Sequence, residues 1–120
     1  MLHILAALAA LMGAAGVATA ALAAHAAASP LLPSAAQMLM VHAAAVLALL
    51  ALGHGRREER WFAAVAGAMI VGVCLFAGDL SARVWLDGRL FPFAAPIGGG
   101  LTIAAWLAAA GVSILAIFRG

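Results

Sequence analysis

Residues 61–82 read WFAAVAGAMIVGVCLFAGDLSA, and within this stretch Asp79 is the single charged residue. Helices rise 1.5 Å per residue, so about 20 mainly apolar residues cross the roughly 30 Å hydrocarbon core of a bilayer. Trp61 and Phe62 at its start are the aromatic residues typical of a membrane interface, and Trp85 suggests the opposite interface. The stretch is therefore predicted to be a transmembrane helix.

Three further stretches have the same character: residues 2–26, 34–52 and 97–118. A chain of 120 residues has room for little besides these four segments. We therefore predict an all-α, polytopic integral membrane protein in which residues 1–120 form a single membrane domain, a bundle of four transmembrane helices.

The first apolar stretch also raises the question of a signal peptide. Its apolar run exceeds the 7 to 15 residues of a typical signal-peptide core and has no Lys or Arg before it. We interpret it as the first transmembrane helix rather than as a cleaved leader.

The composition excludes several classes of protein. The chain is 68% hydrophobic and 8% charged, whereas soluble domains carry about 25% charged residues. No basic face is evident, so nucleic acid is not an expected partner. The formal net charge of +2 is better explained by membrane topology and by weak attraction to anionic headgroups, with membrane lipids as the expected partners. Cys74, the only cysteine, is expected to be a small buried hydrophobe.

The arginines predict an orientation. With four crossings, both termini and the central loop share one side of the membrane. That side holds Arg56, Arg57, Arg60 and Arg119, and the other side holds Arg83 and Arg89. By the positive-inside rule, the termini are predicted to be cytoplasmic in a multi-pass protein of the cell (inner) membrane.

Two turns contain prolines that mark helix starts. Residues 29–34 include Pro30 and Pro33, and Ser34 is a plausible N-cap for the second helix. Pro96 suits the first turn of the fourth helix. Gly98, Gly99 and Gly100 follow it without the Lys-Ser/Thr of a phosphate loop, so we interpret them as a site of close helix packing or of a backbone bend.

Polar residues within the apolar stretches are few and cluster toward one side. A charge at the centre of a membrane helix costs about 2.5 to 3.5 kcal/mol on insertion scales, so each such residue calls for an explanation. In an up-down bundle, seven of them fall toward the non-cytoplasmic side. They are Thr102 and Trp106 of the fourth helix and five candidate site residues, His25, Gln37, His42, Asp79 and Arg83. We expect His42 to lie roughly 12 Å below the start of its helix. Asp79 and Arg83 have the i,i+4 spacing of a pair on one helix face.

These five residues are the candidate site, and three interpretations remain open. The first is an internal hydrogen-bond network in a structural or accessory protein that packs against a larger membrane complex. The second is a transporter or channel for a small solute or protons, acting as a homo-oligomer. The third is metal or haem binding by His25 and His42, since imidazole titrates near neutral pH and offers a neutral nitrogen ligand.

The known chemical motifs are missing from the chain. It has no His-x-x-x-His or Cys-x-x-Cys pattern, so no metal or cofactor is assigned. It has neither Gly-x-Ser-x-Gly nor His-Glu-x-x-His, and no nucleophile stands with a convincing base. We therefore expect that the protein is not an enzyme.

Several segments resemble an uncharacterised family of small bacterial inner-membrane proteins, typified by YgdD and YwdK. Residues 20–25, AALAAH, are similar to a glycine and alanine segment that closes in histidine, and Gln37 and His42 match a glutamine and a histidine of the second helix. Residues 75–80, LFAGDL, are similar to a Leu-Phe-Ser-Gly-Ser-Leu stretch, although Asp79 stands where the family more often has a small polar residue.

The strongest part of the resemblance lies at the fourth helix. Residues 95–99, APIGG, followed by Trp106, are similar to the most recognisable signature of the family. The resemblance implies a four-helix membrane domain. It also implies that His25, His42 and the turn containing Pro96, Gly98 and Gly99 form the centre of the family. It implies no established activity.

Overall fold

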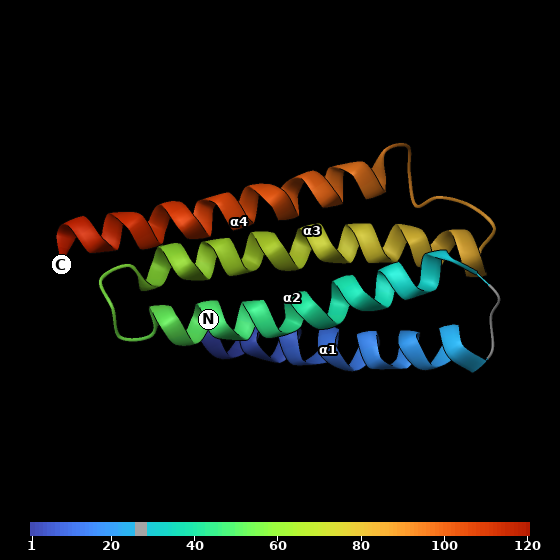
Figure 1. Cartoon of the computed structure of the whole chain (residues 1–120), viewed down its shortest axis with the longest axis horizontal. Coiled ribbons are helices and arrows are strands. Elements are labelled where there is room, and N and C mark those ends of the chain that lie inside the picture. Colours follow the sequence, from blue (N-terminus) through green and yellow to red (C-terminus); the bar gives the residue numbers. More distant parts are fainter. Residues whose placement is uncertain (26–28) are drawn as a thin grey trace.

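The computed structural model describes residues 1–25 and 29–120, and it forms four long helices with no strand in that part of the chain (Figure 1). The helices are α1 (Leu2–His25), α2 (Leu31–Gly53), α3 (Glu59–Trp85) and α4 (Ala94–Arg119). Each is long and apolar enough to span a membrane. The predicted all-α fold with four membrane-spanning helices is confirmed.

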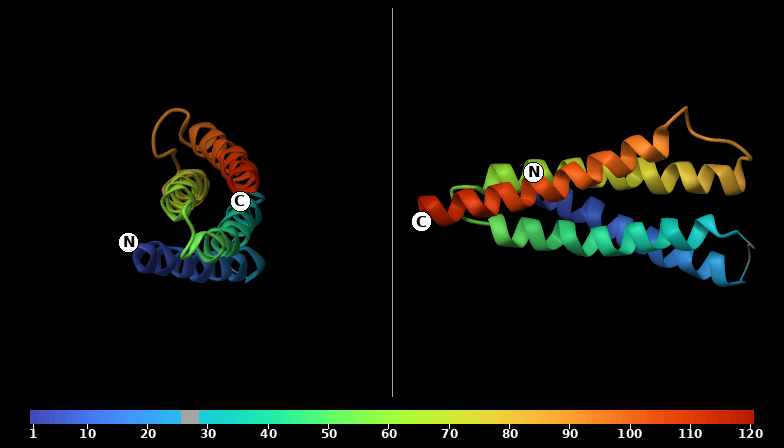
Figure 2. Two further views of the ribbon diagram at one scale, coloured as in Figure 1. Left: turned by 90° about the vertical axis from the view of Figure 1, so that its left-hand side faces the viewer. Right: turned by 45° about the horizontal axis from the view of Figure 1, so that its top comes forward.

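The helices lie side by side in an elongated bundle with principal extents of 50 × 26 × 20 Å. Each packs mainly against its neighbour in the sequence, and α1 also makes a smaller contact with α3. Figure 2 shows the same arrangement from one end of the bundle and in an oblique view with the top brought forward. Helices α2 and α3 contribute most of the buried residues, whereas α1 and α4 flank them and keep most of their surface exposed.

Three predicted helix starts differ from the structure: those of α2, α3 and α4. Helix α2 begins at Leu31, so Ser34 is not its N-cap; Pro30 holds the cap position, and the Leu31 N–H donates to Ser29 Oγ at 3.3 Å. The prediction was wrong because proline fits the first turn of a helix, so Pro33 continues α2 instead of delaying it. Helix α3 likewise begins at Glu59, two residues before the predicted start.

Pro96 of α4 and the two tryptophans of α3 agree with their predicted positions in the helices. Helix α4 begins at Ala94, three residues before the predicted start at 97, and Pro96 lies in its first turn as predicted. Trp61 and Trp85 lie near opposite ends of α3 and are half exposed. The predicted extension of the first helix to residue 26 lies outside the described residues.

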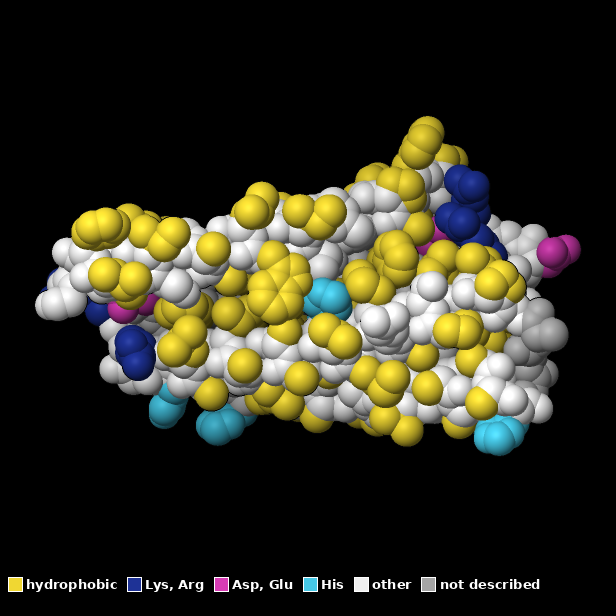
Figure 3. Space-filling view, viewed as in Figure 1, with side chains coloured by type: hydrophobic (Ala, Val, Ile, Leu, Met, Phe, Trp, Pro, Cys, Tyr) yellow, Lys and Arg dark blue, Asp and Glu magenta, His cyan; other side chains and the backbone are white. Residues whose placement is uncertain are grey.

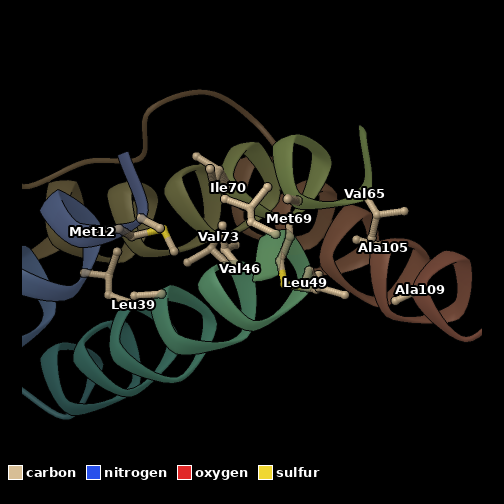
Figure 4. Close-up of a cluster of buried hydrophobic side chains, with 14 of the residues drawn as sticks. Met12, Leu39, Val46, Leu49, Val65, Met69, Ile70, Val73, Ala105 and Ala109 are labelled. Carbon is tan, nitrogen blue, oxygen red and sulfur yellow. The ribbon is translucent and has the colours of Figure 1, made fainter. Parts of the chain in front are cut away.

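The interior is filled by apolar side chains from all four helices. Val46, Met69 and Val73 are fully buried at the centre, with Met12 and Leu39 beside them (Figure 4). Cys74, by contrast, is exposed on α3, so the prediction that it is buried was wrong. It follows the buried Val73 by one position, and one helical residue turns the side chain about 100° away from the core.

Glycines allow the helix backbones to approach closely at two places. A Cβ atom at Gly98 would lie 2.5 Å from Gly72 O and 2.6 Å from Phe76 N, so α3 and α4 touch backbone to backbone there. A Cβ atom at Gly16 of α1 would lie 3.0 Å from Met40 N of α2. Such close contacts between small residues drive helix association in lipid, where burial of apolar surface supplies little.

The three consecutive glycines of α4 are not equivalent, and this yields a test. Gly98→Ala is expected to destabilise the fold by about 1 to 3 kcal/mol, because the added methyl group meets backbone atoms that cannot move aside. Gly100→Ala meets nothing within 4 Å and is expected to stabilise α4 by up to about 1 kcal/mol. Thermal unfolding of both variants in one detergent measures the difference, and equal melting temperatures would contradict the α3–α4 contact.

Candidate functional site

His42 is a buried polar residue near the middle of α2, and both of its ring nitrogens have partners inside the chain. His42 Nδ1 lies 2.8 Å from Met38 O, one helical turn earlier. Trp106 Nε1–H of α4 donates to His42 Nε2 at 3.2 Å. The two rings meet edge to face, with centroids 6.0 Å apart and an interplanar angle of 64°.

These two bonds define the state of the imidazole. A carbonyl oxygen accepts only, so Nδ1 must carry the proton and donate to Met38 O. An indole N–H donates only, so Nε2 must be the unprotonated acceptor. His42 is therefore neutral with a single tautomer, and neither nitrogen is free for another ligand unless one of these bonds breaks.

His42 lies deeper than the sequence predicted. It is 11 residues after Leu31, the first residue of α2, which places it about 16 Å along the helix instead of 12 Å. Trp106 is similarly close to the middle of α4. Figure 3 shows a histidine side chain midway along the bundle, between apolar side chains of two helices. The correction follows from the earlier start of α2, and the pair belongs to the middle of the span rather than to its outer end.

Asp79 and Arg83 form a second group, on α3. Asp79 is fully buried, and Arg83 Nη2 donates to Asp79 Oδ2 at 2.6 Å, which confirms the predicted i,i+4 pair. The other carboxylate oxygen accepts a hydrogen bond from the Leu90 N–H at 2.9 Å. Asp79 thus ties the loop between α3 and α4 to the end of α3, and Leu90 is a partner that sequence reasoning missed.

The remaining two candidates stand apart from these groups. His25 is exposed at the last residue of α1. Gln37 is exposed on α2 and lines a shallow pocket of about 350 Å³ together with Ser34, Met38, Val41, His42 and Phe76. Among the described residues, no hydrogen bond or ion pair joins His25, His42 and Asp79 to one another.

The predicted single polar pocket is therefore two separate groups, one at His42 and one at Asp79. His25 ends α1 close to the start of α2, whereas His42 lies about 16 Å further along, so one metal ion cannot be held by both in this arrangement. Within the described residues, no cluster of three or more His, Cys, Asp or Glu could hold a metal.

Four hydroxyl groups in the helices form hydrogen bonds within their own helix. Thr19, Ser81, Thr102 and Ser113 each donate to the carbonyl oxygen four residues earlier, at 2.7 to 2.9 Å. Trp106 appeared in the sequence as part of a structural motif, and its role as the partner of His42 was missed. The available signal was an indole N–H in the middle of an apolar helix, which needs an acceptor because lipid offers none.

A family model described as Protein of unknown function (DUF423) matches residues 12–99. The match includes His42, Asp79 and Gly98, and it ends before Trp106. It agrees with the resemblance to an uncharacterised family. No curated protein and no solved structure matches the chain.

The bond between His42 and Trp106 is testable by a double-mutant cycle. His42→Ala and Trp106→Phe are expected to be coupled by about 0.6 kcal/mol, and at most about 1.7 kcal/mol, the range for hydrogen bonds between membrane helices. The coupling is measured by unfolding in detergent. Trp85→Phe, which removes an indole from α3, serves as the control and should be additive with His42→Ala; equal coupling in both cycles would contradict the assignment.

The hydrogen bond between Asp79 and the Leu90 N–H predicts that loss of the carboxylate exposes the α3–α4 loop to proteolysis. Asp79→Asn removes the charge that holds Arg83 and turns an amide toward its guanidinium, so trypsin is expected to cut after Arg89 several-fold faster. The rate is read by mass spectrometry of the fragments in detergent. Asp87→Asn is the matched control, because Asp87 has a positive φ of 55° that asparagine also tolerates. An unchanged rate for Asp79→Asn would show that the loop is held by other contacts.

Proposed function

This chain belongs to the DUF423 family of proteins of unknown function, and from its own residues we propose that it is a non-enzymatic structural or accessory protein of the membrane. The observation that carries the proposal is the internal pairing of the polar groups buried in the span. His42, Asp79 and Thr102 are buried, and each is bonded within the chain. A substrate that used the donor groups of His42 or Thr102 would have to displace a bond that the chain already supplies. Among the described residues, Arg83 Nε is the buried side-chain nitrogen without a partner.

The flanking helices supply the surface for association. Large apolar side chains are exposed along α4, among them Ile103, Leu107 and Ile114. The same helix also carries small residues: Gly100 and Gly111 have open space where a Cβ atom would stand. In α1, only Ala9, Met12 and Gly16 are buried. Lipid or the helices of a larger membrane complex can cover such faces, and small residues let a second helix approach closely.

The pocket beside Gln37 and His42 is the observation that favours a transporter as second candidate. It brings Ser34, Gln37 and His42 to one opening of about 350 Å³. Toward the centre of the bundle, however, Val46, Met69 and Val73 are fully buried against one another. A solute or proton path through one protomer is closed by these side chains, so transport would need a path between protomers of a homo-oligomer.

The proposal includes an orientation and a location. The loop between α2 and α3 carries Arg56 and Arg57, and Arg60 follows in the first turn of α3. Arg119 ends α4 and belongs to the same end of an up-down bundle. The positive-inside rule supports a cytoplasmic location for this end, with both termini, in the cell inner membrane.

Site-specific crosslinking tests the accessory role. A photoreactive amino acid at Ala104, which is exposed on α4, is expected to give one protein adduct of defined mass in native membranes. The same group at Ala105, which is 3% exposed, is expected to give none beyond this chain and is the matched control. A lone monomer by native mass spectrometry, without any adduct from Ala104 or from exposed Ala14 of α1, would contradict the proposal.

A proton-flux measurement distinguishes the transporter from the structural or accessory role. Proteoliposomes with an internal pH-sensitive dye are expected to leak no faster with this protein than without it, because the core is closed. His42→Leu is then expected to leave the signal unchanged. Flux in the wild type that His42→Leu abolishes would overturn the structural role in favour of transport.

A further inference from the structure

A groove lies between the start of α3 and the last turns of α4. It has a volume of about 240 Å³ and is lined by Glu58, Arg60, Trp61, Val112, Leu115 and Arg119. Figure 3 shows basic, acidic and apolar side chains together at this end of the bundle. The polar groups that serve the interior, His42 and Asp79, take no part in it.

The residues that line the groove change from charged at its mouth to apolar at greater depth. Arg60 and Arg119 are exposed and belong to the ends of their helices. Leu115 precedes Arg119 by one helical turn, about 6 Å deeper along α4, and Val112 is about 10 Å deeper. The groove therefore combines two cationic side chains at its mouth with an apolar wall that runs toward the hydrocarbon region.

Arg60 and Arg119 form no ion pair in the part of the chain that the structure describes. Among the described residues, the ion pairs are Arg83 with Asp79 and His54 with Glu59. Glu59 Oε2 accepts a hydrogen bond from the Gly55 N–H at 2.7 Å and lies 3.6 Å from His54 Nδ1. Its carboxylate therefore contacts the loop before α3 and does not pair with Arg60. Arg60 and Arg119 remain available to an anion.

Arg60 is also held in place before any ligand arrives. Its guanidinium carbon lies 5.2 Å from the centroid of the Trp61 ring, within the range of a cation–π interaction. Trp61 is half exposed at the start of α3, where an indole suits the headgroup region. The ordering lowers the entropy that a ligand must remove when it binds Arg60.

We propose that this groove binds one anionic phospholipid, with its phosphate between Arg60 and Arg119 and an acyl chain along Leu115 and Val112. Two guanidinium groups match a phosphate in charge and in hydrogen-bond geometry. The apolar wall matches an acyl chain, which a soluble phosphate lacks. This site is independent of the proposed accessory role and of the side of the membrane that it faces.

Loss of the Glu58 charge is expected to change lipid affinity in the opposite direction to loss of an arginine. The Glu58 side chain lines the same groove and is 8% exposed, so its carboxylate opposes a bound phosphate. Removing this charge is expected to strengthen binding, whereas removing either arginine weakens it. A gain of affinity cannot come from a variant that fails to fold.

Native mass spectrometry of the full chain in detergent, titrated with phosphatidylglycerol or phosphatidylcholine, measures the binding. Arg60→Gln and Arg119→Gln are each expected to weaken phosphatidylglycerol binding about fivefold, the effect of one arginine near an anionic lipid. Glu58→Gln is expected to strengthen it by at least twofold. Arg57→Gln is the matched control: it removes the same charge from the same end but does not line the groove, and its affinity should stay within twofold of wild type.

Three results would overturn the proposal. Equal binding of phosphatidylcholine and phosphatidylglycerol would show that charge is not recognised. An Arg57→Gln variant as weak as Arg60→Gln would show diffuse attraction in place of a site. Inorganic phosphate that binds as tightly as the lipid would show that the apolar wall contributes nothing.

Discussion

Hydrocarbon offers no hydrogen-bond partner, and this constraint shapes the protein more than any other. A buried polar group in a membrane must find its partner within the protein. Thr102 meets the constraint within one helical turn, whereas His42 reaches across to Trp106 of α4. Asp79 meets it through Arg83 and the Leu90 N–H. The same bonds that satisfy these groups therefore also hold α4 and its preceding loop in position.

Close packing works together with these bonds. Helices α3 and α4 touch at Gly72 and Gly98, where no side chain separates the backbones. Because α4 starts from this contact, Trp106, two turns further on, comes within reach of His42 on α2. The flanks of the bundle face outward with apolar and small residues, and Arg60 and Arg119, which form no ion pair among the described residues, lie at the end with both termini. The proposed association with lipid or with other membrane helices would therefore use surfaces that the interior does not need.

Much of this fold could be predicted from the sequence, because the length and hydropathy of a membrane-spanning helix are local properties. The pairing of Asp79 with Arg83 was predictable for the same reason, since four residues on one helix define a shared face. The partnership of His42 with Trp106 was not, because 64 residues separate them and their contact depends on how α4 crosses α2. The outward position of Cys74 also depends on the rotation of α3, which an apolar pattern on all faces leaves undetermined.

We propose that the polar groups of the span are internal bridges instead of a ligand site, and the protonation of His42 is the sharpest measure of this. Solid-state NMR of ¹⁵N-histidine-labelled protein in lipid bilayers reports the protonation of each ring nitrogen. We expect a neutral His42 with a protonated Nδ1 and an unprotonated Nε2 that is hydrogen-bonded to the Trp106 indole. A charged ring, the opposite tautomer, or an Nε2 signal that Trp106→Phe leaves unchanged would contradict it.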